Sequence, residues 1–318
     1  IATGALLLLW GQSLRAAELP VVEVGVPNNG VFGLGGHYLL DKGLDRKNGY
    51  IMKPRWAGVT EIERLLAIAA VQVGLSTSES AVRANLRGID LRLITPYMQP
   101  HQQVLVRKES PYRSVEDLKG KPLALTPEVT ALYNMFDFTM RKMGYDIEKD
   151  FDLKKLSAAG IIAALERGDV EGAVLWEAHI SKLLATGRYK VIFFLRDAME
   201  KSLETEVKLM GWIGALQPWV KAHRDLIPKI RVSWRETWQG VQKDQTHFRK
   251  YAKELFGLDK PQAVDIGWER TSQFLLPPDF VWPNASALKV ELSYLKQGVK
   301  MGMFPEKARN VIEPMFVP

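Results

Sequence analysis

Ten polar or aromatic residues that follow predicted strands have side chains suited to holding a small molecule. They are Asn28, Asn29, Ser76, Thr77, Tyr97, Thr126, Glu128, Thr130, Trp176 and Glu177. Hydroxyl groups, amides and the unpaired backbone N–H groups of helix N-termini bind oxyanions such as sulfonate or nitrate. The same residue types also form turns, cap helices and fill cores. They therefore predict a ligand site only where the fold gathers their loops in one place.

The two glutamates in this set determine which ligand charge is expected. Glu128 should lie in the first turn of a helix, where it complements the helix dipole and would repel an anion bound at the same N-terminus. If Glu128 and Glu177 face the ligand, an amino-bearing or aromatic ligand stacked on Trp176 or Tyr97 is the better interpretation. If Glu128 points outward, the serine and threonine hydroxyls favour an oxyanion. We take the oxyanion as the first interpretation and keep the aromatic ligand as the alternative.

The chain contains no residue pattern typical of an enzyme. Its five histidines show no metal-ligand spacing, and it lacks the HExxH, P-loop and GxSxG motifs. It also has no cysteine, which excludes disulfides, thiolate catalysis and a lipid-attachment cysteine. We therefore expect a binding protein without catalytic residues, cofactor or metal.

Length and composition indicate a folded protein of two domains. The chain has 318 residues, of which 47% are hydrophobic, and a formal net charge of +7. Its densest basic stretch, 221–235, lies among tryptophans, a combination found in nucleic-acid binders. However, Ile230, Trp234, Trp238 and Val241 recur at helical intervals on one face. This spacing favours a packed amphipathic helix, and we expect no nucleic-acid partner.

The first residues, IATGALLLLWGQSLRAAELP, look like the end of a secretory signal. An apolar run from Ala5 to Trp10 precedes the small residues Ala16 and Ala17, and this run is far too short to cross a bilayer. We expect residues 1–17 to be the remnant of a cleaved signal peptide. Export without cysteine indicates a Gram-negative periplasm. A buried N-terminal helix is the alternative.

Predicted strands and helices alternate along the first two thirds of the chain, which is typical of an α/β fold. The predicted strands are Val21–Val26, Val71–Leu75, Leu91–Thr95, Val104–Val106, Leu123–Leu125, Ala173–Trp176 and Val191–Leu195. The predicted helices include Tyr38–Gly43, Glu61–Ala70, Val129–Met143 and Gly160–Arg167, and helices dominate after Pro218. Two similar helix–strand units, at 66–75 and 165–174, suggest two lobes of related design.

Two apolar stretches are placed to carry the chain between these lobes. We expect crossings near Gln103–Arg107 and near Leu209–Leu216, with no flexible linker. The first lobe would then comprise 18–105 and 214–318, and the second lobe 106–213. Two crossings form a hinge, and a ligand would bind in the cleft between the lobes.

The segment VLVRKESPYRSVEDLKGKPLALT, at 104–126, resembles one that recurs in the substrate-binding proteins of bacterial ABC importers. Specifically, it is similar to the group for nitrate, sulfonates, taurine and thiamine precursors. The segment KGLDRKNG at 42–49 also resembles that group. Trp176 and Glu177 stand where the group often has Trp-Glu-Pro, although Ala178 replaces the proline here, so this loop departs from the pattern of the group.

The resemblance implies a type II periplasmic binding protein with two α/β lobes joined by a two-crossing hinge. It implies a solute-binding component that carries a sulfonate, taurine or nitrate to an ABC permease in the inner membrane, and a monomer. It also implies that the ten strand-end residues form the loops of the interlobe cleft.

Other functions on the same fold remain as alternatives. The ligand could be a thiamine-pyrimidine-like or other heteroaromatic molecule, or the protein could be an exported adaptor without a transport role. Thiamine-pyrimidine synthases share the fold but carry a cysteine-rich signature that this chain lacks. LysR-type effector domains follow a helix-turn-helix, whereas we expect a secretory segment before Val21 here.

Overall fold

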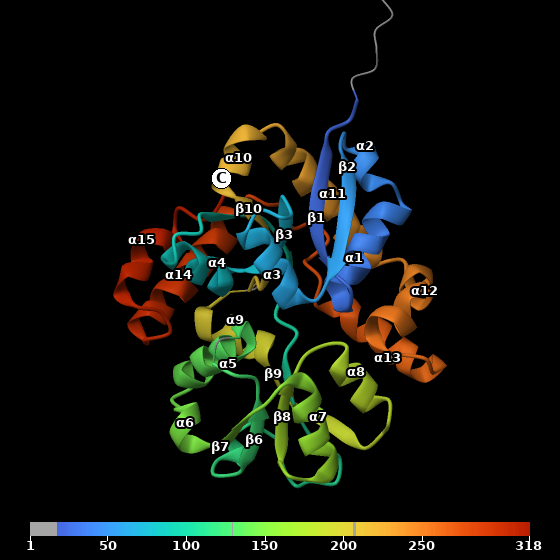
Figure 1. The fold of residues 1–318 in the computed structure, drawn as a ribbon. Helices are drawn as coiled ribbons and strands as arrows, with labels where there is room; N and C mark the ends of the chain where they lie inside the picture. The colour runs from blue at the N-terminus through green and yellow to red at the C-terminus, as the bar shows by residue number, and fades with distance from the viewer. Residues whose placement is uncertain (1–17, 129, 206–207) are drawn as a thin grey trace, which may run out of the picture.

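The structure is a computed structural model that describes residues 18–128, 130–205 and 208–318. Two α/β lobes lie one above the other in Figure 1, each built on a five-stranded sheet. The expected α/β class with two lobes is therefore confirmed. The expected signal segment, 1–17, lies outside the described residues. No helix within the described ranges is both long enough and apolar enough to cross a membrane.

In the five-stranded sheet of the first lobe, one strand runs antiparallel to the other four. In spatial order its strands are β2 (Ile51–Ala57), β1 (Val21–Pro27), β3 (Val73–Thr77), β10 (Gly211–Leu216) and β4 (Leu91–Met98). Strand β1 is parallel to β2 and β3, whereas β10 is antiparallel to both β3 and β4. The sequence analysis missed β2 here and also the strand Asp152–Lys155 of the second lobe, because the residues of both are mostly exposed or half-buried and lack an apolar run.

The sheet of the second lobe repeats this arrangement. Its strands, in spatial order, are β7 (Asp152–Lys155), β6 (Pro122–Leu125), β8 (Gly172–Leu175), β5 (Gln103–Arg107) and β9 (Tyr189–Phe194). Strand β6 is parallel to β7 and β8, and β5 is antiparallel to β8 and β9. Thus β5 and β10, which follow the two crossings, are each the antiparallel fourth strand of the sheet they enter.

The lobe boundaries expected from the sequence fall within strands of the two sheets. Strand β5 lies wholly in the second sheet, so a boundary between 105 and 106 would divide a strand. In the same way, β10 begins at Gly211 in the first sheet, and a boundary at 214 would divide it. The apolar runs looked like connections because a buried strand and a buried crossing have the same composition. We propose that 99–102 and 208–210 belong to the crossings, and the second of these overlaps the expected segment Leu209–Leu216.

Helices cover both sheets. Those of the first lobe before the crossing are α1 (Gly30–Asp41), α2 (Leu44–Lys47), α3 (Val59–Ala67) and α4 (Ser78–Leu86). Those of the second lobe are η1 (Glu116–Leu118), α5 (Ala131–Lys142), α6 (Ile147–Asp150), α7 (Ala158–Arg167), α8 (His179–Leu184) and α9 (Leu195–Leu203). After β10 come α10 (Gln217–Ala222), α11 (Leu226–Val241), α12 (Gln245–Phe256), α13 (Pro261–Gln273), α14 (Ala285–Lys300), η2 (Glu306–Ala308) and α15 (Arg309–Ile312).

Helix α1 begins eight residues before the predicted start at Tyr38, because a glycine-rich segment expected to be a loop is helical. Its glycines allow close packing. A Cβ atom at Gly33 would lie 2.7 Å from the carbonyl oxygen of Pro27, and one at Gly36 would lie 2.5 Å from Val26 Cγ1. Glycine lowers helix propensity, but here it lets α1 approach β1 closely. The helix therefore starts directly after Asn29, at the end of β1.

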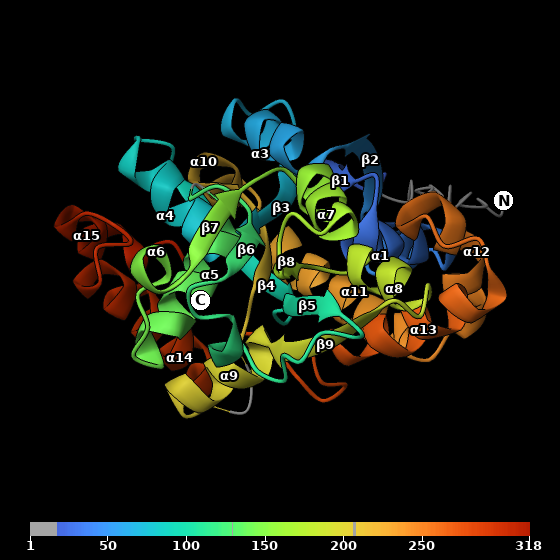
Figure 2. The ribbon, with the colours of Figure 1, turned by 90° about the horizontal axis from the view of Figure 1, so that it is seen from below.

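The C-terminal helices contact both lobes. Helix α11 packs on α1 and β4, and its predicted apolar face is buried, including Trp234 and Trp238. Helix α13 packs against α12 and also against α8 of the second lobe, while α14 contacts α9. Figure 2 shows α13 beside α8 and α14 beside α9. The lobes are thus joined by C-terminal helices as well as by the two crossings.

Candidate functional site

The first lobe contributes the loops after β1 and β3. Asn28 and Asn29 are exposed, and Asn29, the N-cap of α1, makes no side-chain capping bond. Its amide is therefore available to a ligand at the N-terminus of this helix. Thr77 caps α4 by accepting a hydrogen bond from the backbone N–H of Ser80 at 3.1 Å. Ser76 is buried and its hydroxyl donates to the carbonyl oxygen of Thr77.

Tyr97 lies in the core of the first lobe. Only 4% of it is exposed, and its ring packs 4.5 Å from Phe32 and 5.4 Å from Trp238, centroid to centroid. On its other side, a Cβ atom at Gly211 would lie 2.2 Å from the ring. Burial raises the pKa of the Tyr97 hydroxyl. In this conformation the ring offers no free face for a ligand to stack on.

In the second lobe, Thr126 and Thr130 lie close together between β6 and α5. Their Oγ1 atoms are 2.7 Å apart, and Thr130 caps α5 by accepting the Tyr133 N–H at 3.2 Å. The Thr130 hydroxyl donates to the carbonyl oxygen of Pro127 at 2.8 Å, so the shared proton between the two threonines comes from Thr126. Both hydroxyl protons are thus used within the loop. An oxyanion would have to displace one of these bonds to receive it.

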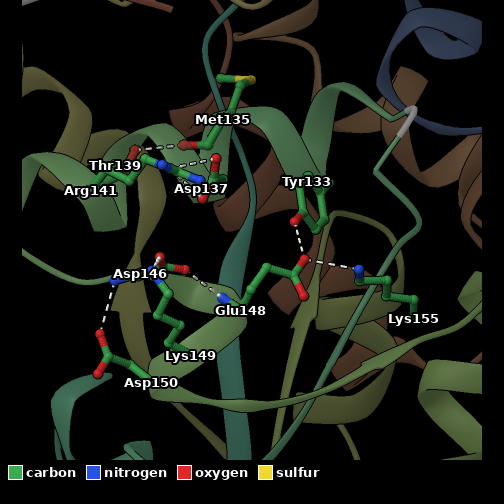
Figure 3. A network of polar contacts seen from close by, with 10 residues as sticks. All are labelled: Tyr133, Met135, Asp137, Thr139, Arg141, Asp146, Glu148, Lys149, Asp150 and Lys155. Carbon is green, nitrogen blue, oxygen red and sulfur yellow. Dashed lines mark hydrogen bonds and ion pairs between the residues drawn. The ribbon is translucent and has the colours of Figure 1, made fainter. Parts of the chain in front are cut away.

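Glu128 belongs to a network of charged side chains in the second lobe. Its side chain is 63% exposed, and its Oε1 lies 2.5 Å from Lys155 Nζ. Lys155 also lies 2.8 Å from Oε1 of Glu148, which accepts a hydrogen bond from the Tyr133 hydroxyl, as Figure 3 shows. The hydrogen bonds of these two glutamates raise the pKa of Lys155. The charge of Glu128 is therefore balanced by a lysine.

Glu177 forms an ion pair that joins the second lobe to the C-terminal helices. Its side chain is fully buried, and its Oε1 accepts from Arg270 Nε at 2.6 Å. Its Oε2 accepts from the hydroxyl and the backbone N–H of Ser181, at 2.5 and 3.2 Å. Arg270 lies on α13 and also donates to the side-chain oxygen of Gln103 on β5. The neighbouring Trp176 is half-buried, with its ring 4.9 Å from that of His179.

A second buried network lies directly behind the Ser76–Thr77 loop. Ser78, the first residue of α4, donates to Oε1 of Glu291 on α14 at 2.5 Å. Oε2 of Glu291 accepts from Lys208 Nζ at 2.7 Å, and both of these charged side chains are almost completely buried. Glu79 accepts from the Tyr294 hydroxyl at 2.6 Å. These contacts tie the start of α4 to the return crossing and to α14.

Sequence analysis did not identify Arg270, Lys208 or Glu291. Glu291 is separated from Lys208 by 83 residues and from Ser78 by 213, and Arg270 is separated from Glu177 by 93. No local spacing indicates such pairs. A weak signal was present at Glu291, which occupies a position on the apolar face of α14 between Ala287 and Tyr294. A charged residue on a buried helical face needs a partner.

Comparisons with known proteins identify the class of this chain. The family model for the periplasmic substrate-binding protein of ABC transporters for phosphonate matches residues 39–229. A curated relative from Escherichia coli (strain K12), named for aliphatic sulfonates binding, is 26% identical over 159 residues. This alignment covers 49% of the chain and 48% of the relative, so the chain spans about half the length of the curated relative that it matches.

Solved structures share the fold. The periplasmic aliphatic sulphonate binding protein SsuA from Escherichia coli is 18% identical with a TM-score of 0.73, over 92% of this chain and 96% of that one. The alkanesulfonate-binding protein SsuA from Xanthomonas axonopodis pv. citri, bound to MOPS, is 18% identical with a TM-score of 0.74, over 95% and 99%. The expected importer class is confirmed, although the matching family model is described for phosphonate. The chain belongs to this family of periplasmic substrate-binding proteins of ABC transporters.

Proposed function

We propose that this protein binds a small organic anion, such as a sulfonate or taurine, or the inorganic anion nitrate, between its two lobes and delivers it to an ABC permease of the inner membrane. The proposal further includes secretion through a cleaved signal peptide and action as a monomer. Closure would bring the loops of both lobes onto the ligand, so that ligand and permease each bias the balance of open and closed forms.

The observation that carries the anionic ligand is the pairing of both acidic residues in the expected site. Glu128 is paired with Lys155, and Glu177 with Arg270. Neither carboxylate is therefore a free negative charge that would repel an anion or attract an amine. The other expected site residues of the strand-end loops have neutral side chains. One of them is Asn29, whose amide makes no capping bond. Neutral donors at helix N-termini suit an oxyanion.

The relatives support the same ligand class. The curated relative is named for aliphatic sulfonates, and two similar structures are sulfonate-binding proteins. The aromatic-ligand alternative keeps less support, because Tyr97 is packed in the core and only Trp176 offers a half-buried ring. An exported adaptor would bind none of these ligands.

Thermal unfolding with a ligand panel tests the proposal. Residues 18–318 would be heated with taurine, methanesulfonate, nitrate, an alkylphosphonate and a thiamine pyrimidine. At one hundred times the dissociation constant, binding adds about 2.7 kcal/mol to the free energy of unfolding. This raises the melting temperature by roughly 2 to 4 °C in a chain of this size. A shift with sulfonates, absent for the pyrimidine, is the expected result.

The panel also separates the alternatives. A shift with the pyrimidine alone would overturn the anionic ligand and favour the heteroaromatic one. If no compound of the panel raises the melting temperature, even after the protein has been unfolded and refolded to remove any copurified molecule, the adaptor would be favoured. Isothermal titration with the active compound then gives the affinity against which site variants are compared.

A further inference from the structure

A cavity of about 210 Å³ lies in the first lobe, apart from the interlobe loops. It is enclosed by the end of β4, one face of α11 and the segment that joins α13 to α14. Side chains that matter for its chemistry are Thr95, Arg231, Arg235, Trp238, Phe280 and Trp282. None of its lining residues comes from the second lobe. None of the ten residues expected in the interlobe site lines the cavity, although the ring of Tyr97 packs against its wall at Trp238.

The cavity has a buried apolar floor and a partly exposed mouth. Trp238 and Trp282 are 3% and 6% exposed, and Thr95 is 5% exposed. Arg235 and Phe280 are only half-buried and lie toward solvent. A cavity of about 150 Å³ lined by apolar side chains is large enough for benzene. This one therefore has room for a single aromatic ring with a small substituent at the mouth.

The two arginines of the cavity wall differ in their partners. Arg231 donates to three backbone carbonyl oxygens, those of Ile94, Val317 and Pro318, at 3.0, 2.9 and 3.0 Å. Burial lowers its pKa. Its guanidinium is therefore occupied in holding the C-terminus against β4.

Arg235, in contrast to Arg231, is not bound to the backbone of the described residues. Within the described part of the chain it makes no hydrogen bond and no ion pair. The adjacent Glu236 is bound instead by Lys47 and Asn48, at 2.6 and 2.9 Å. Asp279, on the segment that borders the mouth, makes no ion pair with Arg235 either. Arg235 therefore acts on Glu236 only through its charge. A half-buried guanidinium that makes no hydrogen bond or ion pair within the described residues, next to an aromatic cavity, can receive an anion by two parallel hydrogen bonds.

We propose that this cavity binds a small aromatic carboxylate or sulfonate, independently of the interlobe ligand. The ring lies on the floor against Trp238 and Trp282, and the anionic group stays at the mouth, bound by Arg235. Aromatic rings in contact at offset or edge-on geometry add to the gain from burying their apolar surface. Benzene-type anions satisfy both requirements, whereas short aliphatic sulfonates lack the ring that fills the floor.

Isothermal titration calorimetry, in which benzenesulfonate or benzoate is added to the protein comprising residues 18–318, tests this inference. Arg235→Gln removes the anion partner and should weaken binding by roughly tenfold or more, since hydrogen bonds to a charged group are the strong ones. The substitution should have little effect on folding, because this side chain makes no hydrogen bond or ion pair within the described residues. Arg224→Gln, at an exposed position outside the cavity, removes the same charge and should leave the affinity unchanged.

Further variants separate the two sites. Val232→Phe places a ring at a lining position and should abolish binding while the melting temperature shows that the protein is folded. Trp176→Ala, in the interlobe site, should leave benzenesulfonate binding to the cavity unchanged. The inference is overturned if neither probe binds saturably. It is also overturned if Trp176→Ala abolishes binding and Arg235→Gln does not, because the probe would then bind between the lobes.

Discussion

Arg270 Nε lies 2.6 Å from Oε1 of Glu177, and this contact joins α13 to the loop after β8 of the second lobe. The glutamate is fully buried and the arginine is 15% exposed. The pair has two consequences. It balances the charge of Glu177 at the proposed ligand site, and it makes the position of Trp176 depend on a helix from the C-terminal part of the chain.

Loss of this pair should destabilise the protein strongly. Arg270→Ala leaves a buried carboxylate without its cation, and breaking a buried ion pair costs about 3 to 5 kcal/mol. Urea unfolding measures the change. Glu177→Gln combined with Arg270→Gln removes both charges and should recover most of the loss. Arg167→Ala, in the exposed pair with Asp169, should cost no more than about 1 kcal/mol; a similar small loss in Arg270→Ala would contradict the structural role.

Lys208 should behave in the same way at the return crossing. Lys208→Met leaves Glu291 buried beside Glu79 without a cation, and the expected loss is again about 3 to 5 kcal/mol in the free energy of unfolding. The double variant Lys208→Met with Glu291→Gln should be clearly more stable than Lys208→Met alone. If the double variant is the less stable of the two, Glu291 does not depend on Lys208 for its charge balance.

Acidification should lower the free energy of unfolding through His101, which lies in the proposed first crossing. Burial, with a smaller effect of His179, lowers the pKa of His101 from 6.5 to about 3. The unfolded chain therefore binds a proton below pH 6.5 that the folded chain does not. Stability from this group is fully present above pH 6.5 and falls at lower pH by about 1.4 kcal/mol per unit.

A comparison with a variant isolates this effect. Between pH 6.5 and 5, wild type should lose about 2 kcal/mol more than His101→Phe, as measured by urea unfolding at each pH. Parallel curves for wild type and His101→Phe would show that His101 titrates normally in the folded protein.

Trp176→Ala should weaken binding of the interlobe ligand by roughly tenfold without unfolding the protein, because a half-buried ring contributes contact area to the ligand and little to the core. Calorimetry with the active compound of the panel gives the ratio of affinities. Trp219→Ala, which removes a half-buried tryptophan of α10, is the matched control and should bind as wild type does. An unchanged dissociation constant in Trp176→Ala would exclude this residue from the site.

Tyr97→Phe should bind the same ligand with unchanged affinity. The structure packs this ring between Phe32 and Trp238, and phenylalanine retains those contacts. Tyr97→Ala should instead lose about 3 to 5 kcal/mol of stability, because it opens a void in the core. A large loss of affinity in Tyr97→Phe, with stability preserved, would place the hydroxyl in contact with the ligand.

Local pattern was sufficient to predict much of this molecule. The order of most strands and helices, the two related lobes and the buried face of α11 follow from apolar periodicity and turn residues, which act over a few neighbouring residues. The strands β2 and β7 lack an apolar run and could not be predicted in this way. Helix α1 was shortened in the prediction because glycine is read locally as a loop former. Its role in allowing close contact with β1 depends on a neighbour in space.

The sequence by itself determined the class of the protein, through the segment at 104–126 and the absence of enzyme motifs, and it named the loops that follow the strands. Only the tertiary structure decided how those residues are used. Glu128 and Glu177 are paired, and Tyr97 is packed in the core. The reason is physical. Charge balance and burial depend on residues as far apart as Ser78 and Glu291, which only the folded chain brings together.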